Sequence, residues 1–443
     1  MRAYLTAVLA AALMASSISA ADLSAVVHKA TADVYAQPRL DAPKLATLRR
    51  SAAVKISMQQ GLWYQLQMPA GALGYVRVDD VRIDYADAED GEANVRVLMG
   101  GKAGKGRITE TAGVRGIDES DLKSVAFDQT RLNSMIGFRV DDATAAAYAS
   151  KQGWQATGVP YAAEAKPGKN AGASAAGSAP SEPASASAVS DALGAVDSRL
   201  GSLFGRAAKA IPKSEQQLAA EEVALGPEIT GRILGARPLW NDASAQQRVN
   251  RVGRWVASQT SRPELPWTFG VIDTPEVNAF AAPGGYILIT RGLYELLSSD
   301  SELAAVLGHE ISHCVQRDHY NVIRKQELAT EGKNLASSNV TAGNDTVAGS
   351  LARRYVEQNG ATIMMTALDR DAEYRADEAA EIYLARAGMN PLALYAVLQK
   401  MTALGSKSAS LAQLYKTHPP LDARMDRIDR RGYGAVKSYT TRE

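Results

Sequence analysis

The pattern of hydrophobic and polar residues divides the chain into two kinds of structure. Between residues 34 and 81, short apolar runs are interrupted by Pro38, Pro43, Gly61 and the turn Pro69-Ala70-Gly71. Apolar runs bounded by turn residues are typical of β-strands. We expect strands at residues 34–35, 46–48, 54–56, 63–67 and 74–78. Short strands at this spacing predict a small β-barrel.

The second half of the chain has the period of a helix. Apolar residues recur at three- and four-residue spacing between Leu303 and Ile311, and Ser299 with Glu302 forms a capping box just before them. Further helices are expected at residues 120–136, 214–225 and 243–258, and strands at 267–272 and 286–290. The predicted fold class is therefore α+β, with a small barrel, a flexible linker and a mainly helical domain that holds a small sheet.

Two segments are predicted to lie outside the folded domains. Residues 162–195 consist mainly of Ala, Ser, Gly, Pro and Lys, a composition too poor in apolar surface to fold, and we expect a disordered linker. Residues 1–21 have a basic start, an apolar core and small residues at the end, so we expect a signal peptide cleaved after Ala20 or Ala21. The expected units are then 1–21, a barrel at 22–86, an extension without assigned function at 87–161, the linker, and a domain at 196–443.

Composition narrows the functional classes. The formal net charge of +1 over 443 residues gives no electrostatic reason to bind nucleic acid. No stretch after the signal peptide reaches transmembrane length, so we expect an exported, periplasmic protein. Cys314 is the only cysteine, which excludes an intrachain disulfide, and we expect it to be a buried structural thiol.

The residues His309-Glu310-Ile311-Ser312-His313 carry the main chemical signal. Side chains four apart lie on one face of a helix, so His309 and His313 are able to bind one Zn²⁺ ion per chain. Glu310 lies beside the ion, where a carboxylate takes a proton from a metal-bound water. The competing interpretation is a chance match with packed histidines. It is weakened because four of the chain's five histidines lie from residue 309 onward.

A catalytic zinc site needs a third protein ligand. His319 follows His313 by six residues and would face away from the metal if the helix continued through it. A second helix offers acidic candidates whose spacing does not choose among them: Asp369, Asp371, Glu373, Asp377 and Glu378.

Residues 215–435 resemble the M48 family of zinc metallopeptidases, which have a zincin-type fold. The resemblance rests on separate motifs that occur in order. They are Val277-Asn278-Ala279-Phe280-Ala281-Ala282-Pro283-Gly284-Gly285-Tyr286, Thr290-Arg291-Gly292-Leu293, Glu302 to His313, Glu373-Tyr374-Arg375-Ala376-Asp377 and Thr417-His418-Pro419-Pro420 with Arg424. One departure is that many members carry a histidine one position before His319, so a role borrowed for His319 is in doubt.

The resemblance implies a role for each matching residue. Glu373 would be the third zinc ligand, and Asp377 would orient a ligand histidine. Arg424 would hold a nearby carboxylate. His418 would lie near the metal, where it either stabilises the oxyanion of the tetrahedral intermediate or fills the open coordination position at rest.

These parts predict a zinc endopeptidase. An extended substrate is expected to pair with an edge strand that supplies Asn278, Ala279, Phe280 and Ala281. Unfolded chains can offer such backbone, so we expect the substrates to be unfolded or misassembled envelope proteins. The alternatives are a self-inhibited or non-catalytic, chaperone-like binding protein and, ranked last, a cell-wall hydrolase.

The N-terminal strands resemble a bacterial SH3 domain. The residues that carry this resemblance are Gly61-Leu62-Trp63-Tyr64-Gln65-Leu66 and Gly74-Tyr75-Val76. It implies a cell-wall peptide or another protein segment as ligand, with Tyr35, Trp63 and Tyr75 lining a groove. A barrel whose aromatic residues only fill the core is an equal alternative.

Overall fold

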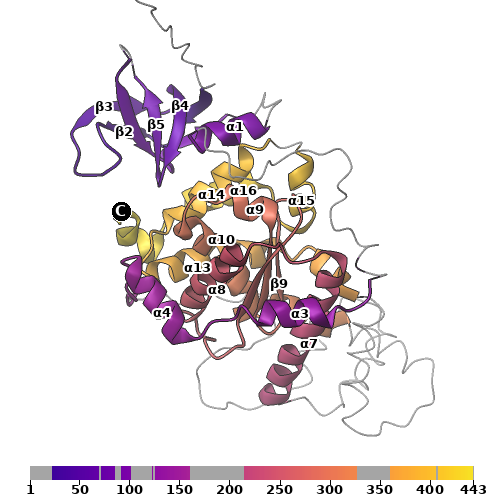
Figure 1. Ribbon diagram of the computed structural model, residues 1–443. Coiled ribbons are helices and arrows are strands. Elements are labelled where there is room, and N and C mark those ends of the chain that lie inside the picture. Colours follow the sequence, from indigo (N-terminus) through magenta and orange to yellow (C-terminus); the bar gives the residue numbers. More distant parts are fainter. Residues whose placement is uncertain are drawn as a thin grey trace, which may run out of the picture.

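A computed structural model describes residues 22–68, 71–84, 91–100, 122, 125–159, 214–326, 360–405 and 408–442. The predicted signal peptide, residues 1–21, and the whole predicted linker, residues 162–195, lie outside these residues. The described chain forms an N-terminal sheet stacked on a larger helical domain that contains a small second sheet (Figure 1). This arrangement confirms the α+β fold class.

The N-terminal sheet is antiparallel and has the strand order β3-β2-β6-β5-β4-β1-β7. Its strands are β1 (Leu23–Val27), β2 (Thr31–Tyr35), β3 (Lys44–Arg49), β4 (Ala53–Gln60), β5 (Trp63–Gln67), β6 (Leu73–Arg77) and β7 (Val81–Ile83). β1 and β7 were not predicted, and α1 (Gly91–Leu98) packs against β4.

The expected barrel does not close, because the outer strands β3 and β7 do not pair with each other. Polar groups of β7 bond instead to Gln399, which donates to the Val81 carbonyl at 2.8 Å and accepts from the Ile83 amide at 3.1 Å. Tyr35 and Trp63 are buried and pack edge to face, with ring centroids 5.4 Å apart, which favours a packing role. Membership of the SH3 family and a ligand for this sheet stay predictions.

The small sheet has the order β8-β10-β9, from β8 (Thr268–Ile272), β9 (Ala279–Ala282) and β10 (Tyr286–Thr290). β10 runs parallel to β8 and antiparallel to β9, so β9 is an edge strand, as expected. The helices around it are α7 (Glu215–Ala236), α8 (Ala243–Ala257), α9 (Arg291–Leu296), α10 (Asp300–Val315), α13 (Arg370–Arg386), α14 (Leu392–Thr402), α15 (Leu414–Thr417) and α16 (Leu421–Arg431). α10 packs against α13, α8 and α14 and is the central helix of this domain.

Helix α7 extends beyond its predicted end at Leu225 and continues through Pro227. The predicted end at Leu225 is therefore wrong. At Gly226 a Cβ atom would lie 2.3 Å from the carbonyl oxygen of Pro283, so glycine is needed where α7 crosses the turn between β9 and β10. Tertiary packing at this crossing offsets the helix-breaking tendency of proline.

Residues 125–159 extend over the helical domain (Figure 1). The helix expected at 120–136 starts at Gln129 as α3 (Gln129–Ile136), because the Asp128 side chain caps it, and it packs against α7. α4 (Asp142–Lys151) packs against α8. Whether residues 87–161 form a unit of their own stays a prediction.

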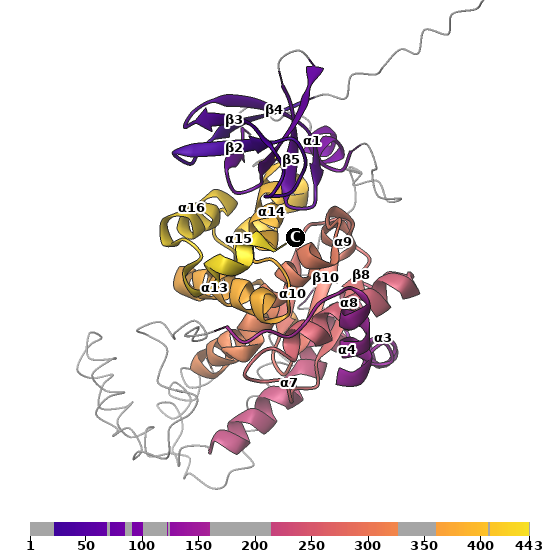
Figure 2. The ribbon, with the colours of Figure 1, turned by 90° about the vertical axis from the view of Figure 1, so that its left-hand side faces the viewer.

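Helix α14 separates the N-terminal sheet from the zinc-motif helix α10 in both ribbon views (Figure 1 and Figure 2). Every residue of α14 is buried. Gln399 bonds to the sheet, and Lys400 forms an ion pair with Glu302 of α10 at 2.7 Å. Arg82 of β7 reaches Asp429 of α16 at 2.6 Å. The sheet is therefore held by specific polar contacts.

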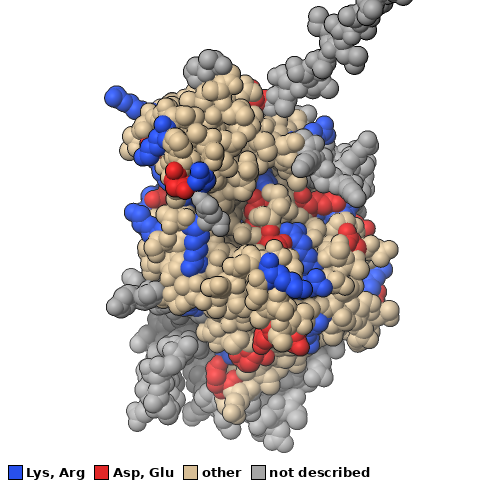
Figure 3. Space-filling model, turned by 60° about the vertical axis from the view of Figure 1, so that its left-hand side comes forward, with Lys and Arg blue, Asp and Glu red and all other residues tan. Residues whose placement is uncertain are grey.

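The surface has no large field of one sign on the face shown in Figure 3, where acidic and basic side chains are interspersed. This agrees with the formal net charge of +1. Within the described residues, no helix has the length and apolar character needed to cross a membrane.

Candidate metal centre and its surroundings

Helix α10 carries the first three functional side chains. Ser299 caps it by accepting a hydrogen bond from the Glu302 amide at 3.1 Å, which confirms the predicted start. His309 and His313 lie one turn apart and their Nε2 atoms are 3.3 Å apart. Both rings are buried, so the helix presents two nitrogen donors to one enclosed point.

Helix α13 supplies the carboxylates. Asp369 caps it at 2.7 Å from the Ala372 amide, and Asp371 is exposed. Glu373 and Asp377 are buried and four residues apart, so both face α10. Glu373 Oε2 lies 3.4 Å from His309 Nε2, and Oε1 lies 3.7 Å from His313 Nε2. The residue named by the family resemblance is thus the one that meets the two histidines.

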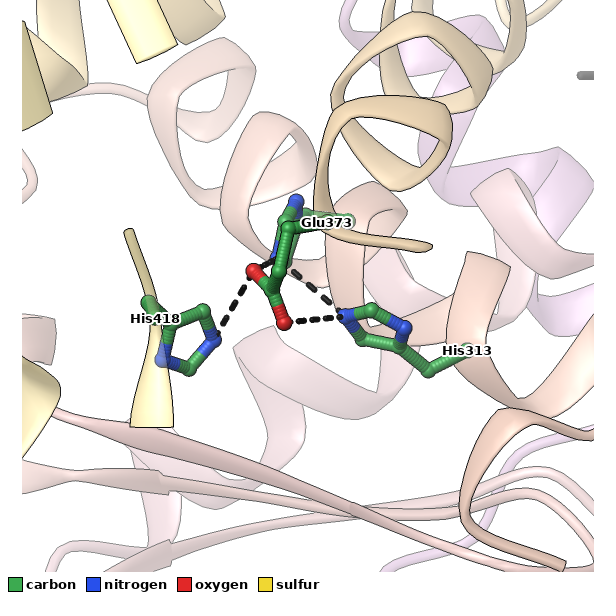
Figure 4. Close-up of side chains that lie close together, drawn as sticks. His313, Glu373 and His418 are labelled. Carbon is green, nitrogen blue, oxygen red and sulfur yellow. Dashed lines mark hydrogen bonds and ion pairs between the residues drawn. The ribbon is translucent and has the colours of Figure 1, made fainter. Parts of the chain in front are cut away.

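His418 reaches the same point from the C-terminal side, directly after α15. Its Nε2 atom lies 3.7 Å from Glu373 Oε2, and its Nδ1 atom lies 2.8 Å from the Thr417 hydroxyl. Figure 4 shows the Glu373 carboxylate between the nitrogens of His418 and His313. One donor atom from each of His309, His313, Glu373 and His418 lies within 4.8 Å of the others.

This donor set fits a metal ion. Two donors that each lie about 2.0–2.1 Å from one tetrahedral ion are about 3.3 Å apart. The observed spacing of 3.3–3.7 Å is close to that value. Glu373 Oε2 is also buried without a hydrogen-bond partner among the described residues, which is costly unless a cation satisfies it.

The charges around the site favour a cation. Burial and Arg424 lower the pKa of His309, yet Asp377 and Glu373 together raise it to about 9. Burial opposes ionisation of Glu373, but His418 and His309 lower its pKa below the ordinary range. Burial lowers the pKa of His418 to about 3, which leaves its imidazole neutral and available as a ligand.

Glu310 lines the same pocket as His313, Glu373 and His418. Its side chain is buried, and burial raises the pKa of its carboxyl group although His309 opposes the shift. A carboxylate with a raised pKa beside a metal site is suited to accept a proton and return it.

Asp377 and Arg424 lie on the Nδ1 side of the His309 ring. Asp377 Oδ1 lies 3.0 Å from His309 Nδ1, and Arg424 donates to both Asp377 oxygens, at 3.0 Å from Nε and 2.5 Å from the terminal nitrogen. The hydrogen bond at Nδ1 leaves Nε2 free to face the metal position.

A matching carboxylate behind His313 was missed. Asp318 Oδ2 lies 2.8 Å from His313 Nδ1, and its other oxygen lies 3.7 Å from Arg375. Each histidine therefore has its own carboxylate and its own arginine. The sequence does show an acidic residue, Asp318, five positions after the second histidine. Asp318 can reach His313 only because α10 ends before residue 318, and the sequence pattern did not predict that end.

The expectation that His319 faces away is wrong, because α10 ends at Val315. Arg317 adopts a left-handed conformation, with φ of 58°, and residues 318–326 start a new helical segment. The reversal brings His319 back beside His313, with ring centroids 5.9 Å apart, and into the pocket lining.

The edge strand β9 runs along the pocket. Ala279, Phe280 and Ala281 line it together with Glu310, His313, Glu373 and His418. Asn278 is fully buried one residue before the strand, bonds through its backbone to Thr290, and is not among the described lining residues. Cys314 is buried and its thiol donates to the Ala282 carbonyl at 3.3 Å, so it is structural, as expected.

Residues 243–432 match the model of Peptidase family M48. This part of the chain, less than half of its 443 residues, is therefore similar to peptidase family M48. The matched range includes His309, His313, Glu373 and His418, which together could hold a metal ion, and the two carboxylates of Asp377 and Asp318.

Curated relatives carry related names. The chain is 28% identical over 213 residues to the Beta-barrel assembly-enhancing protease of Escherichia coli (strain K12), which covers 46% of this chain and 42% of the relative. It is 30% identical over 155 residues to the Mitochondrial metalloendopeptidase OMA1 of Arabidopsis thaliana, and this match covers 35% of this chain and 29% of that relative. It is 27% identical over 173 residues to the Metalloprotease LoiP of Escherichia coli (strain K12), and this match covers 39% of this chain and 66% of that relative. The chain thus spans less than half the length of the first relative.

Proposed function

We propose that this chain is a zinc endopeptidase of the cell envelope that hydrolyses unfolded or misassembled proteins. The observation that carries the proposal is that His309, His313 and Glu373 cluster at a pocket. Glu310 and the edge strand β9 also line this pocket. Three protein ligands with a neighbouring carboxylate are the parts of a metal-dependent hydrolase.

His309, His313 and Glu373 would hold the ion through Nε2, Nε2 and a carboxylate oxygen. The chemistry that zinc supplies when bound is polarisation of the scissile carbonyl and a lowered pKa of a water molecule. Glu310 accepts the proton of that water and returns it to the leaving amine. Asp377 and Asp318 keep the two imidazoles in the tautomer that presents Nε2.

His418 offers a fourth donor, but a catalytic zinc site needs one position open for water. The proposal is that His418 occupies that position at rest and leaves it when substrate enters. His418→Ala then raises the turnover of a small unfolded substrate. If His418 instead stabilises the oxyanion, the same variant lowers kcat and leaves zinc affinity unchanged.

Cleavage within a chain is supported by the pocket lining. Among its described residues there is no Lys or Arg to bind a terminal carboxylate. β9 is an edge strand of its sheet, and an edge strand offers backbone pairing, which depends little on sequence and needs an extended substrate. The signal-peptide pattern of residues 1–21 supports the periplasm as the place of action.

The test compares one substrate protein in folded and permanently unfolded forms. We expect the zinc-loaded chain to cleave the unfolded form at internal bonds, to lose this activity with a chelator, and to regain it with zinc. Equal turnover of both forms contradicts the substrate class, and cleavage only at chain ends contradicts the endopeptidase.

The second candidate is a non-catalytic, chaperone-like binding protein. The observation that favours it is the four-donor set, since closed zinc sites are typically structural. It predicts that the chain binds zinc and an unfolded protein without cleaving it, even after His418→Ala.

A further inference from the structure

A two-residue turn after α10 places a carboxylate behind the second histidine. α10 ends at Val315, and the reversal at Arg317 brings Asp318 to 2.8 Å from His313 Nδ1. A left-handed backbone is unfavourable for a residue with a Cβ atom, so tertiary contacts must hold Arg317 there.

Those contacts come from helix α7, far away in the sequence. Arg317 Nε donates to Glu222 Oε2 at 2.8 Å, and Arg317 also pairs with Glu215. The Glu222 carboxylate is fully buried and accepts a hydrogen bond from each terminal nitrogen of Arg262, at 2.9 and 2.8 Å. Arg262 also donates to the Cys314 carbonyl at 2.9 Å, in the last turn of α10.

We propose that Glu222 is a positioning residue for the metal site: through Arg317 it holds the left-handed turn that keeps Asp318 on His313. The chain of contacts is continuous, from Glu222 to Arg317, through one peptide unit to Asp318, and from Asp318 to the imidazole. Arg375 reaches the other oxygen of Asp318, at 3.7 Å, and fixes it from the side of α13.

Glu222 also connects this turn to the edge strand. The backbone of Glu222 and Val223 packs against Gly284, where an added Cβ atom would lie 2.8 Å from Val223 Cα. Gly284 belongs to the turn that directly follows β9. One turn of α7 therefore touches both the segment behind the second metal ligand and the end of the strand proposed to bind substrate.

The competing explanation is that the ion pair between Glu222 and Arg317 only stabilises the fold. A measurement of zinc affinity distinguishes this explanation from the positioning role. The inference rests on the proposed function, so it is tested by zinc affinity of the full chain, measured by competition with a chromophoric chelator and without turnover. Loss of a partner behind a ligand histidine weakens metal binding about 10–100-fold. We expect Asp318→Asn to fall in this range and Glu222→Gln to weaken binding about 10-fold.

A double-mutant cycle tests whether Glu222 acts through Asp318. In the Asp318→Asn background, Glu222→Gln is expected to have no further effect on zinc affinity. Two independent effects that multiply overturn the proposal, as does a Glu222→Gln variant with unchanged affinity. The matched control is Glu228→Gln. Glu228 lies on the same helix, and its carboxylate pairs with Arg232 at 2.9 Å. We expect this variant to leave zinc affinity unchanged.

A second pair of variants tests the turn itself and stays informative if Glu222→Gln fails to fold. Glycine adopts positive φ readily and alanine does not. Both Arg317→Gly and Arg317→Ala lose the ion pair, so a difference between them reports the backbone. We expect Arg317→Gly to retain more zinc affinity than Arg317→Ala; equal losses overturn the role of the turn. A wild-type chain that binds no zinc would instead overturn the proposed function.

Discussion

Replacing Arg424 with leucine leaves the buried carboxylate of Asp377, beside the candidate metal site, without its cationic partner. Arg424 donates two hydrogen bonds to Asp377, at 3.0 and 2.5 Å, and the side chains of both residues are 4% exposed. Burial raises the pKa of Asp377, and Arg424 with His309 lowers it to about 2. Without Arg424, the buried Asp377 carboxylate loses one of the partners that offset its desolvation cost.

The magnitude follows from burial. Removing one partner of a buried, hydrogen-bonded ion pair costs about 3–5 kcal/mol, whereas removing both partners costs much less. We expect Arg424→Leu to lower the free energy of unfolding by about 3–5 kcal/mol and Arg424→Leu/Asp377→Asn to recover a large part of that loss.

The assay is urea unfolding followed by circular dichroism, with a chelator present so that bound metal does not add to stability. The control is Arg39→Leu, which removes an ion pair of similar length, 2.6 Å to Asp41, whose side chains are 43% and 71% exposed. We expect no measurable change there. If Arg424→Leu is as mild as the control, or if the double variant is less stable than the single one, burial does not set the strength of this pair.

Three further predictions concern the contact between the N-terminal sheet and α14. Gln399→Leu leaves the Val78 and Val81 carbonyls and the Ile83 amide without their partner, so we expect a loss of about 1–3 kcal/mol per group in urea unfolding; an unchanged midpoint argues against these bonds. Lys400→Met leaves Glu302 unpaired at the start of α10; we expect a loss of about 3–5 kcal/mol that Glu302→Gln partly reverses, and no reversal would contradict the pairing. Burial lowers the pKa of His28 although Asp429 opposes the shift; the folded state therefore binds this proton more weakly than the unfolded chain, and stability should fall as pH drops below about 6.5 and depend less on pH in His28→Gln.

The metal centre could be predicted from the sequence wherever one helix carries the geometry. His309, Glu310 and His313 follow from the helical period alone. Glu373 did not, because five acidic residues share its segment. Of these five, only Glu373 and Asp377 are buried, and Asp369 caps the helix. Glu373 lies near the Nε2 atoms of both histidines, whereas Asp377 bonds to Nδ1 of His309.

Features that depend on distant contacts could not be predicted in this way. No glycine marks the end of α10, and Arg317 turns the chain because Glu222, 95 residues earlier, pairs with it. For that reason Asp318 was missed, and His319 was expected to face away from the metal. Similarly, five of the seven strands of the N-terminal sheet were predicted, but β7 was not, and its polar groups bond to Gln399 of a helix more than 300 residues away.

The most direct test of the account is the comparison of wild type with Glu310→Gln, both shown by metal analysis to hold one zinc ion per chain, on one unfolded protein. The account predicts equal zinc content, cleavage by wild type, and loss of nearly all cleavage in the variant, since the amide cannot accept the proton of the water. Cleavage by Glu310→Gln at the wild-type rate, or a wild-type chain that holds zinc and never cleaves, would contradict it.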